Sequence, residues 1–244
     1  METELFLARI NDIANQTRKS EKPKFLGFLS SEQAFLAKQT LEKQNIKFDF
    51  FGGYPNAQRK VLACLPDWAG DTVYPITAVT FRFRKTDVLK HRDFLGAILG
   101  LGLKRESVGD ILIEEGRAIV FLLDEICDYV LTQIEKIGRT GVKATFGFEE
   151  PLPESETLAQ FSETVASLRL DCVVSSLANV SRAESTRLIE LGLVSINSMV
   201  CSKTVKTVNS GDILTIRGKG KFIIDDVSEK SRKNRIILRY KKYI

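Results

Sequence analysis

The sequence has few of the residues from which metal sites and disulfides are built. It contains one histidine, His91, and four cysteines, Cys64, Cys127, Cys172 and Cys201, with no Cys-x-x-Cys pair among them. A Cys/His zinc site is therefore not expected, and we predict no bound metal. Cysteines this far apart are typical of reduced thiols in a cytosolic protein.

Long apolar runs are also missing. No stretch of about 18 apolar residues occurs, so no membrane-spanning helix and no membrane partner are predicted. The start Met1-Glu2-Thr3-Glu4 has neither the basic residues nor the apolar core of a signal peptide. Together these features predict a cytoplasmic protein.

Catalytic constellations are absent as well. There is no Ser/His/Asp or Cys/His arrangement, and His91, near the start of a predicted helix, fits a surface or capping residue better than a general base. Gly52-Gly53 is not followed by Gly-Lys-Ser/Thr, so it fits a hairpin turn and not a phosphate loop. We expect no catalytic residues and no cofactor.

Positive charge is concentrated at one end of the chain. Residues 165–244 carry 15 Lys and Arg against 7 Asp and Glu, a net charge of +8. Residues 1–164 carry 21 against 24, a net charge of −3. Such asymmetry indicates a polyanionic partner for the C-terminal third.

Periodicity predicts an α+β protein with three domains. Residues 1–74 read as a small α/β domain, with helices in 1–20 and 32–44 and strands at 46–51 and 59–65. Residues 75–150 read as a ferredoxin-like, RRM-type middle domain. Its predicted elements are a strand at 76–84, a helix at 87–101, strands at 111–114 and 118–123, a helix at 124–137 and a strand at 142–148. After a linker, a helix at 157–168 leads into a third domain, 157–244, whose basic tail is predicted to contain one more strand.

The middle domain lacks the stacking aromatic motif of an RRM in its strand 118–123, so single-strand base stacking is not predicted there. Its basic residues form a possible second RNA-contacting face. These are Arg82, Arg84, Lys104, Arg105, Arg139 and Lys143.

The most informative stretch is 169–227. Ser181 is suited to cap a helix, Glu184 stands at the capping-box position, and Gly192 can end the helix in the left-handed conformation. A short strand, a turn at Asn197, a Ser-Gly-Asp turn at 210–212 and a Gly-Lys-Gly hairpin at 218–220 follow. This order resembles the S4 RNA-binding module, which binds structured RNA with two helices against a small curved sheet. The RNA-binding residues predicted on it are Arg169, Ser181, Arg182, Arg187, Lys203, Lys219 and Lys221.

The full layout, with the stretch His91 to Leu103 followed by Val108-Gly109-Asp110-Ile111, resembles the YlmH-like proteins. That resemblance implies a non-catalytic, cytoplasmic protein that binds rRNA and peptidyl-tRNA on the large ribosomal subunit. It further implies ribosome-associated quality control of stalled translation beside a tailing factor, and a less direct association with cell-division genes. Nothing in the sequence demands a dimer, and a monomer is expected.

Two alternatives remain open. One is an RNA-modifying enzyme that an S4 module targets. Arg169-Leu170-Asp171 superficially matches a pseudouridine-synthase triplet, but too little chain follows it, and Gly100-Leu101-Gly102 follows a helix where a methyltransferase needs a strand. The other is a cell-division scaffold, which would not need the basic C-terminal third.

Overall fold

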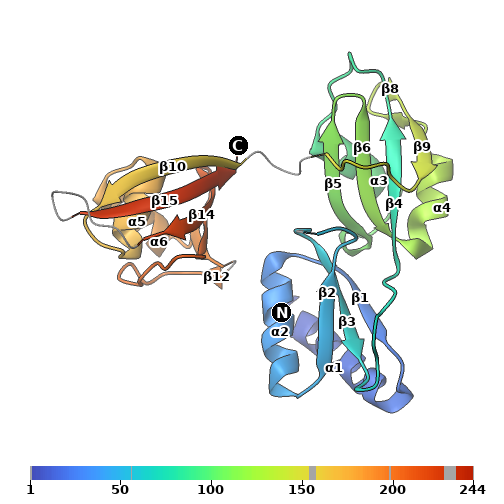
Figure 1. Ribbon diagram of the computed structural model, residues 1–244, viewed down its shortest axis with the longest axis horizontal. Helices are drawn as coiled ribbons and strands as arrows, with labels where there is room; N and C mark the ends of the chain where they lie inside the picture. Colours follow the sequence, from blue (N-terminus) through green and yellow to red (C-terminus); the bar gives the residue numbers. More distant parts are fainter. Residues whose placement is uncertain (1, 56, 154–157, 198, 228–234, 244) are drawn as a thin grey trace. The chain divides into compact units, whose positions relative to one another are not determined.

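The computed structural model confirms the α+β class and describes residues 2–55, 57–153, 158–197, 199–227 and 235–243 (Figure 1). The chain forms two compact units, Met1–Ser155 and Glu156–Ile244, called unit 1 and unit 2 below. Each unit has its own hydrophobic core. The finer division of unit 1 at residue 74 stays a prediction.

Unit 1 begins with two helices packed on a three-stranded antiparallel sheet of order β1-β3-β2. Its elements are α1 (Glu2–Ser20), β1 (Lys24–Leu29), α2 (Ser31–Lys43), β2 (Lys47–Phe51) and β3 (Lys60–Leu65). Alternate residues of β3 face opposite sides of the sheet, as strand geometry requires. Leu62 and Cys64 pack with the helices, whereas Val61 lies in a second cluster on the opposite face.

The second sheet of unit 1 has the order β5-β6-β4-β9 and is antiparallel throughout. Its elements are β4 (Ile76–Arg82), α3 (His91–Gly100), η1 (Arg105–Ser107), β5 (Val108–Glu114), β6 (Arg117–Leu123), α4 (Asp124–Gln133) and β9 (Lys143–Phe146). A two-stranded ribbon, β7 (Lys136–Ile137) with β8 (Thr140–Gly141), precedes β9. The strand–helix–strand–strand–helix–strand order is the predicted one. Val79 and Phe81 face the helices α3 and α4 in a shared core.

The other face of this second sheet is covered by the first sheet of unit 1. Phe121 of β6 is 1% exposed, and its ring is stacked on that of Tyr54 with the centroids 4.9 Å apart. Phe28 of β1 and Ile119 of β6 belong to the same cluster. Gly53, at φ +96°, passes so close that an added Cβ would lie 2.4 Å from the Phe121 ring. The face on which an RRM stacks bases is therefore buried around β6.

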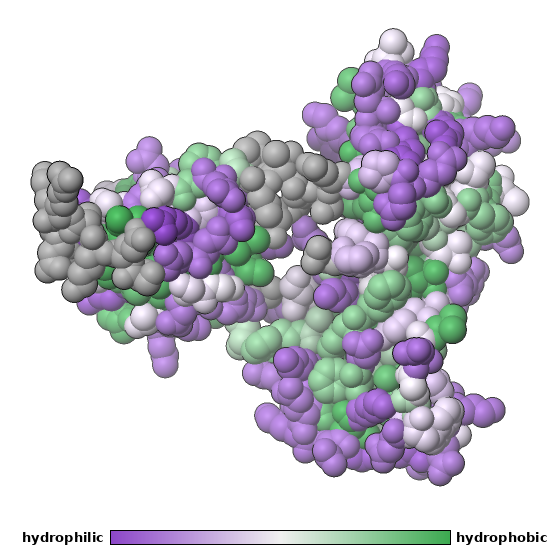
Figure 2. Space-filling view, in the orientation of Figure 1, coloured by the Kyte–Doolittle hydropathy of each residue, from purple (hydrophilic) through white to green (hydrophobic). Residues whose placement is uncertain are grey.

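Unit 2 contains a six-stranded antiparallel sheet of order β10-β15-β14-β13-β11-β12 with two helices packed against it. Its elements are β10 (Leu158–Val165), α5 (Leu170–Ala178), α6 (Arg182–Glu190), β11 (Val194–Ile196), β12 (Met199–Val200), β13 (Ile213–Ile216), β14 (Gly220–Asp226) and β15 (Ile236–Tyr243). The predicted strand in the basic tail is β15. In the view of Figure 2, hydrophilic residues cover much of the visible surface of both units, and apolar residues gather mainly within unit 1.

The turns of unit 2 follow the sequence signals. Gly192 adopts φ +70° after α6, and Asn197 adopts φ +50° after β11. The Asn197 amide donates to the Asp212 carboxylate at 2.7 Å and its oxygen accepts from the Ile213 N–H at 2.8 Å. Asn197 and Asp212 are therefore turn-holding residues, as predicted.

The predicted helix at 157–168 is wrong, because this segment forms the strand β10. β10 pairs along its whole length with β15, from Leu158 opposite Tyr243 to Val165 opposite Ile236. Exposure alternates over its last four residues, from exposed Ser162 to Val165, which is 2% exposed, as expected for a strand.

Two predicted helices are also shorter than expected. α3 begins at His91 and not at residue 87, because the Asp87 N–H donates to the Arg84 carbonyl at 2.9 Å in a separate turn. α4 ends at Gln133 and not at residue 137, because the chain turns at Gly138 (φ +59°) into the ribbon β7–β8. His91 is exposed at the start of α3.

Candidate RNA-binding surface

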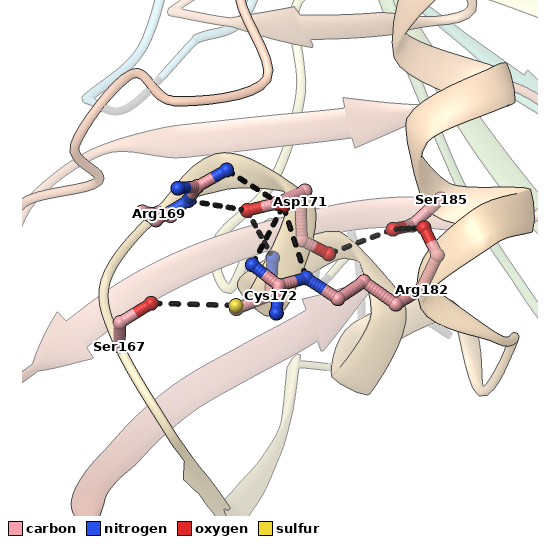
Figure 3. Close-up of polar contacts among 6 residues, drawn as sticks. All are labelled: Ser167, Arg169, Asp171, Cys172, Arg182 and Ser185. Carbon is pink, nitrogen blue, oxygen red and sulfur yellow. Dashed lines mark hydrogen bonds and ion pairs between the residues drawn. The ribbon is translucent and has the colours of Figure 1, made fainter.

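A buried carboxylate in unit 2 holds two arginine side chains together (Figure 3). The Asp171 side chain is 5% exposed, whereas those of Arg169 and Arg182 are 44% and 61% exposed. Arg169 donates from Nε to Oδ1 and from Nη2 to Oδ2, both at 3.1 Å, and Arg182 Nε donates to Oδ2 at 3.1 Å. The carboxylate thus fixes both guanidiniums at the protein surface.

The backbone around Asp171 explains why this carboxylate stays in place. The N–H groups of Leu170 and Asp171, at the start of α5, donate to the carbonyls of Lys206 and Thr204 at 2.8 and 3.1 Å. The Ser185 hydroxyl of α6 donates to the Asp171 carbonyl at 2.8 Å. The two helices and the loop 203–207 are therefore joined at this point, and Lys203 belongs to the same surface region.

Two further residues predicted to bind RNA, Ser181 and Arg187, belong to α6 and its N-cap. The Ser181 Oγ caps the helix by accepting from the Glu184 N–H at 3.1 Å. The Glu184 carboxylate lies 3.9 Å from Arg187, whose side chain is 71% exposed. Arg187 therefore keeps most of its surface open to a ligand, because an exposed ion pair at this distance is weak.

Lys219 and Lys221 lie elsewhere on unit 2. They belong to the hairpin between β13 and β14, where the Arg217 N–H donates to the Leu193 carbonyl at 2.9 Å, just beyond the end of α6. Arg182 is at the opposite end of that helix. The structure thus groups Arg169, Arg182 and the Lys203 loop, and places the two hairpin lysines at a separate position.

A shallow hollow of about 270 Å³ adjoins the arginine pair. Arg182 and Arg235 both line it, together with Cys172, Ser175 and Ser176. Arg235 Nη2 donates to the Thr164 carbonyl at 2.8 Å, which ties the start of the tail strand to β10. The arginine of the tail therefore adds to the basic surface of the two helices.

Sequence reasoning missed the role of Asp171. The sequence alone suggests an enzyme motif for the triplet Arg169-Leu170-Asp171 and RNA binding for Arg169, but no role for Asp171. The signal that could have identified its role is an acidic residue in the first turn of a helix between two arginines. Such a residue is suited to orient neighbouring cations.

The possible second face on unit 1 is divided by the structure. Arg82 lies opposite Lys143 in the β4–β9 pair and forms an ion pair with Glu149 at 2.9 Å. Lys104 and Arg105 precede β5 at the other end of the sheet, since Val108 pairs with Leu122 whereas Arg82 pairs with Arg117. These cations do not form one cluster.

The remaining two residues of that set are also separate. Arg84 pairs with Asp87 at 3.3 Å in the turn before α3. Arg139 lies between β7 and β8. Of the six predicted residues, only Arg82 and Lys143 are therefore adjacent on the β-sheet.

The Asp171 carboxylate should make the stability of unit 2 depend on pH. Burial opposes its ionisation, but the hydrogen bonds from Arg169 and Arg182 outweigh burial and hold its pKa below the ordinary 3.8. Because the native pKa is lower than the unfolded one, the ionised group stabilises the fold above pH 3.8. That contribution is lost as the pH falls through the depressed native value.

We therefore expect Asp171→Asn to lower the urea midpoint of unit 2 at pH 7, and the difference from wild type to shrink as the pH falls below 3.8. Urea unfolding of wild type and variant at several pH values measures this difference. A gap between the two proteins that grows as the pH falls below 3.8 would show that the ionised carboxylate is not the stabilising species.

Comparison with known proteins finds one matching family and a relative that spans most of the chain. Residues 74–146 match the family described as "Putative RNA-binding domain in YlmH". The chain is 29% identical over 219 residues to the "Ribosome-associated protein quality control protein P2" of Bacillus subtilis (strain 168), covering 87% of this chain and 84% of that protein.

A solved structure shares the fold of part of the chain. The "Cell division protein ylmH from Streptococcus pneumoniae" matches with a TM-score of 0.55 and 20% identity, over 60% of this chain and 92% of that one. Within the described residues, every helix is too short or too polar to cross a lipid bilayer. The resemblance to the YlmH-like proteins expected from the sequence is confirmed.

Proposed function

Because the chain resembles the YlmH-like proteins over most of its length, we propose that it binds structured RNA on the large ribosomal subunit without catalysing a reaction. The observation that carries the proposal is the pair of guanidiniums fixed by Asp171 at the surface of unit 2. In this proposal unit 2 is an S4 module and residues 75–150 form a ferredoxin-like domain.

The arginine pair is suited to phosphate oxygens. Each guanidinium uses part of its donor set on the buried carboxylate, and the two side chains remain 44% and 61% exposed. An arginine already held in one rotamer loses less conformational entropy when it binds, so the site is preorganised. Two cations around one carboxylate also leave net positive charge for the RNA backbone.

Shape supplies the selectivity in this proposal. Phosphate contacts position a protein on nucleic acid but carry no sequence information. A rigid junction of two helices and a loop recognises the geometry of a folded RNA better than any one sequence. The partner proposed is rRNA beside a bound peptidyl-tRNA, which the protein, acting as a monomer in the cytoplasm, holds in place for a tailing factor.

Co-sedimentation with separated ribosomal subunits, followed by crosslink mapping, tests the proposal. We expect enrichment on the large subunit, with crosslinks from α5, α6 and the loop 203–207 to rRNA and tRNA. Binding to both subunits alike, or crosslinks confined to unit 1, would contradict it. A chemical change in isolated RNA incubated with the protein would instead favour an RNA-modifying enzyme.

A further inference from the structure

Unit 1 contains a groove that the RNA-binding proposal does not use. It has a volume of about 780 Å³ and lies between α1, the start of α2 and the segment 104–106. This volume falls within the range of small-molecule sites. One wall is apolar, with Leu5, Phe6 and Leu36, and Arg59, Lys104 and Arg105 line it as well.

Arg59 and Arg105 converge on one carbonyl group. Arg59 Nε donates to the Val108 carbonyl at 3.1 Å, and Arg105 Nη1 donates to the same oxygen. Arg59 Nη2 also donates to the carbonyl of Phe28 at 2.6 Å. These bonds fix two like charges side by side at the groove.

No carboxylate of the described residues lies within 4 Å of either guanidinium. Glu106 is paired with Arg9 at 2.9 Å. The Asp110 carboxylate accepts from the Tyr54 hydroxyl and from the N–H groups of Gln58 and Arg59. Glu32 and Glu106 also line the groove, but Glu106 is engaged by Arg9. Among the described residues, the arginine pair therefore has no direct counter-ion.

The pKa values of both arginines are lowered in this arrangement. Burial, then the charge of Arg105, lowers the pKa of Arg59 to about 10, and Asp110 offsets only part of this. Burial also lowers the pKa of Arg105. Strongly perturbed cations in a groove are typical of functional sites.

Both side chains keep donors for a ligand. Arg59 uses Nε and Nη2, and Arg105 uses Nη1. The Nη1 group of Arg59 and the Nε and Nη2 groups of Arg105 have no acceptor among the described residues. Guanidinium donors in this fork geometry match the oxygens of a phosphate.

We propose that this groove binds the phosphate group of a nucleotide-sized ligand between Arg59, Arg105 and Lys104, with the apolar part of the ligand against Leu5 and Leu36. The Leu5 side chain is 66% exposed and therefore free to cover an aromatic ring. The shared chemistry is the phosphate. Its source is a free nucleotide or the backbone of an RNA strand.

Titration of the full chain with adenosine monophosphate, adenosine and inorganic phosphate, followed by calorimetry, tests the proposal. We expect the monophosphate to bind at least about tenfold more tightly than adenosine. Arg105→Gln should weaken that binding at least about tenfold, and Lys104→Gln about threefold. Arg92→Gln, an exposed arginine outside the groove, is the matched control and should bind normally.

Because the Lys104 side chain is exposed, Lys104→Gln should fold normally, and its loss of binding cannot be attributed to misfolding. Equal binding of adenosine and its monophosphate overturns the proposal. Unchanged binding of the monophosphate in both Arg105→Gln and Lys104→Gln also overturns it. So does a loss in Arg182→Gln equal to that in the groove variants.

A short single-stranded RNA identifies the source of the phosphate. If the RNA displaces the monophosphate, and the affinity of the protein for this RNA falls in Lys104→Gln, the groove binds the RNA backbone. If it does not compete, the groove binds free nucleotides. Both results support a phosphate site.

Discussion

Replacing Arg182 and Arg187 together by alanine is expected to weaken binding to the large ribosomal subunit about 100-fold at moderate salt. Both side chains are exposed on α6, one held by Asp171 and the other near Glu184. Each charge-assisted contact to phosphate contributes about 1.4 kcal/mol, a factor of about ten. The dependence of log affinity on log salt should become shallower by about 1.5, because two fewer counterions are released.

The matched control removes two comparable charges from unit 1. Lys38 and Arg92 have side chains that are 57% and 83% exposed, and each has one acidic neighbour, Glu42 at 3.8 Å and Asp93 at 3.8 Å. Their double alanine variant should change affinity less than threefold. Equal losses in the two double variants would mean that only net charge matters. Unchanged binding of Arg182→Ala with Arg187→Ala, in a folded protein, would show that the surface is wrongly assigned.

Asp171→Asn separates orientation from charge in the same assay. It makes unit 2 more positive by one charge while weakening the hydrogen bonds that hold Arg169 and Arg182. If orientation matters, affinity for the subunit falls although non-specific affinity for a homopolymer does not. If both affinities rise together, the carboxylate does not orient the arginines for RNA.

Local signals in the sequence predicted the local structure well. The Ser181 cap, the left-handed Gly192 and the Asn197 turn each depend on side chains within a few residues of one another, and all three are present. The predicted RNA-binding arginines follow from the resemblance to the S4 module, which rests on those turn and cap signals. Their RNA contacts stay a prediction.

Long-range pairing was beyond the reach of the sequence. β10 is a strand because β15 pairs with it more than 70 residues later, and nothing within 157–168 reports that partner. The convergence of Arg59 and Arg105 on the Val108 carbonyl likewise joins residues far apart in sequence. Asp171 is adjacent to Arg169, but its second partner becomes evident only when α5 and α6 pack together.

Phe121→Ala is expected to destabilise unit 1 by about 3–5 kcal/mol, the usual cost of removing a buried aromatic side chain. The Phe121 ring is 1% exposed, stacks on Tyr54 at 4.9 Å and meets Phe148 edge-on at 5.9 Å. Its loss would open a cavity where the two sheets of unit 1 meet. Urea unfolding, followed by the fluorescence of Trp68, the single tryptophan, measures the change.

Phe146→Ala is the matched control, because this aromatic residue lies on β9 of the same sheet but is 59% exposed. It should cost less than about 1 kcal/mol, as surface substitutions do. Similar losses in the two variants would mean that the second sheet is not covered as described.

The contrast between Phe121 and Phe146 also bears on function, because a ring that holds two sheets together is not available to stack on a base. RNA crosslinks to Phe121 in the wild-type protein would therefore contradict this assignment of the sheet face.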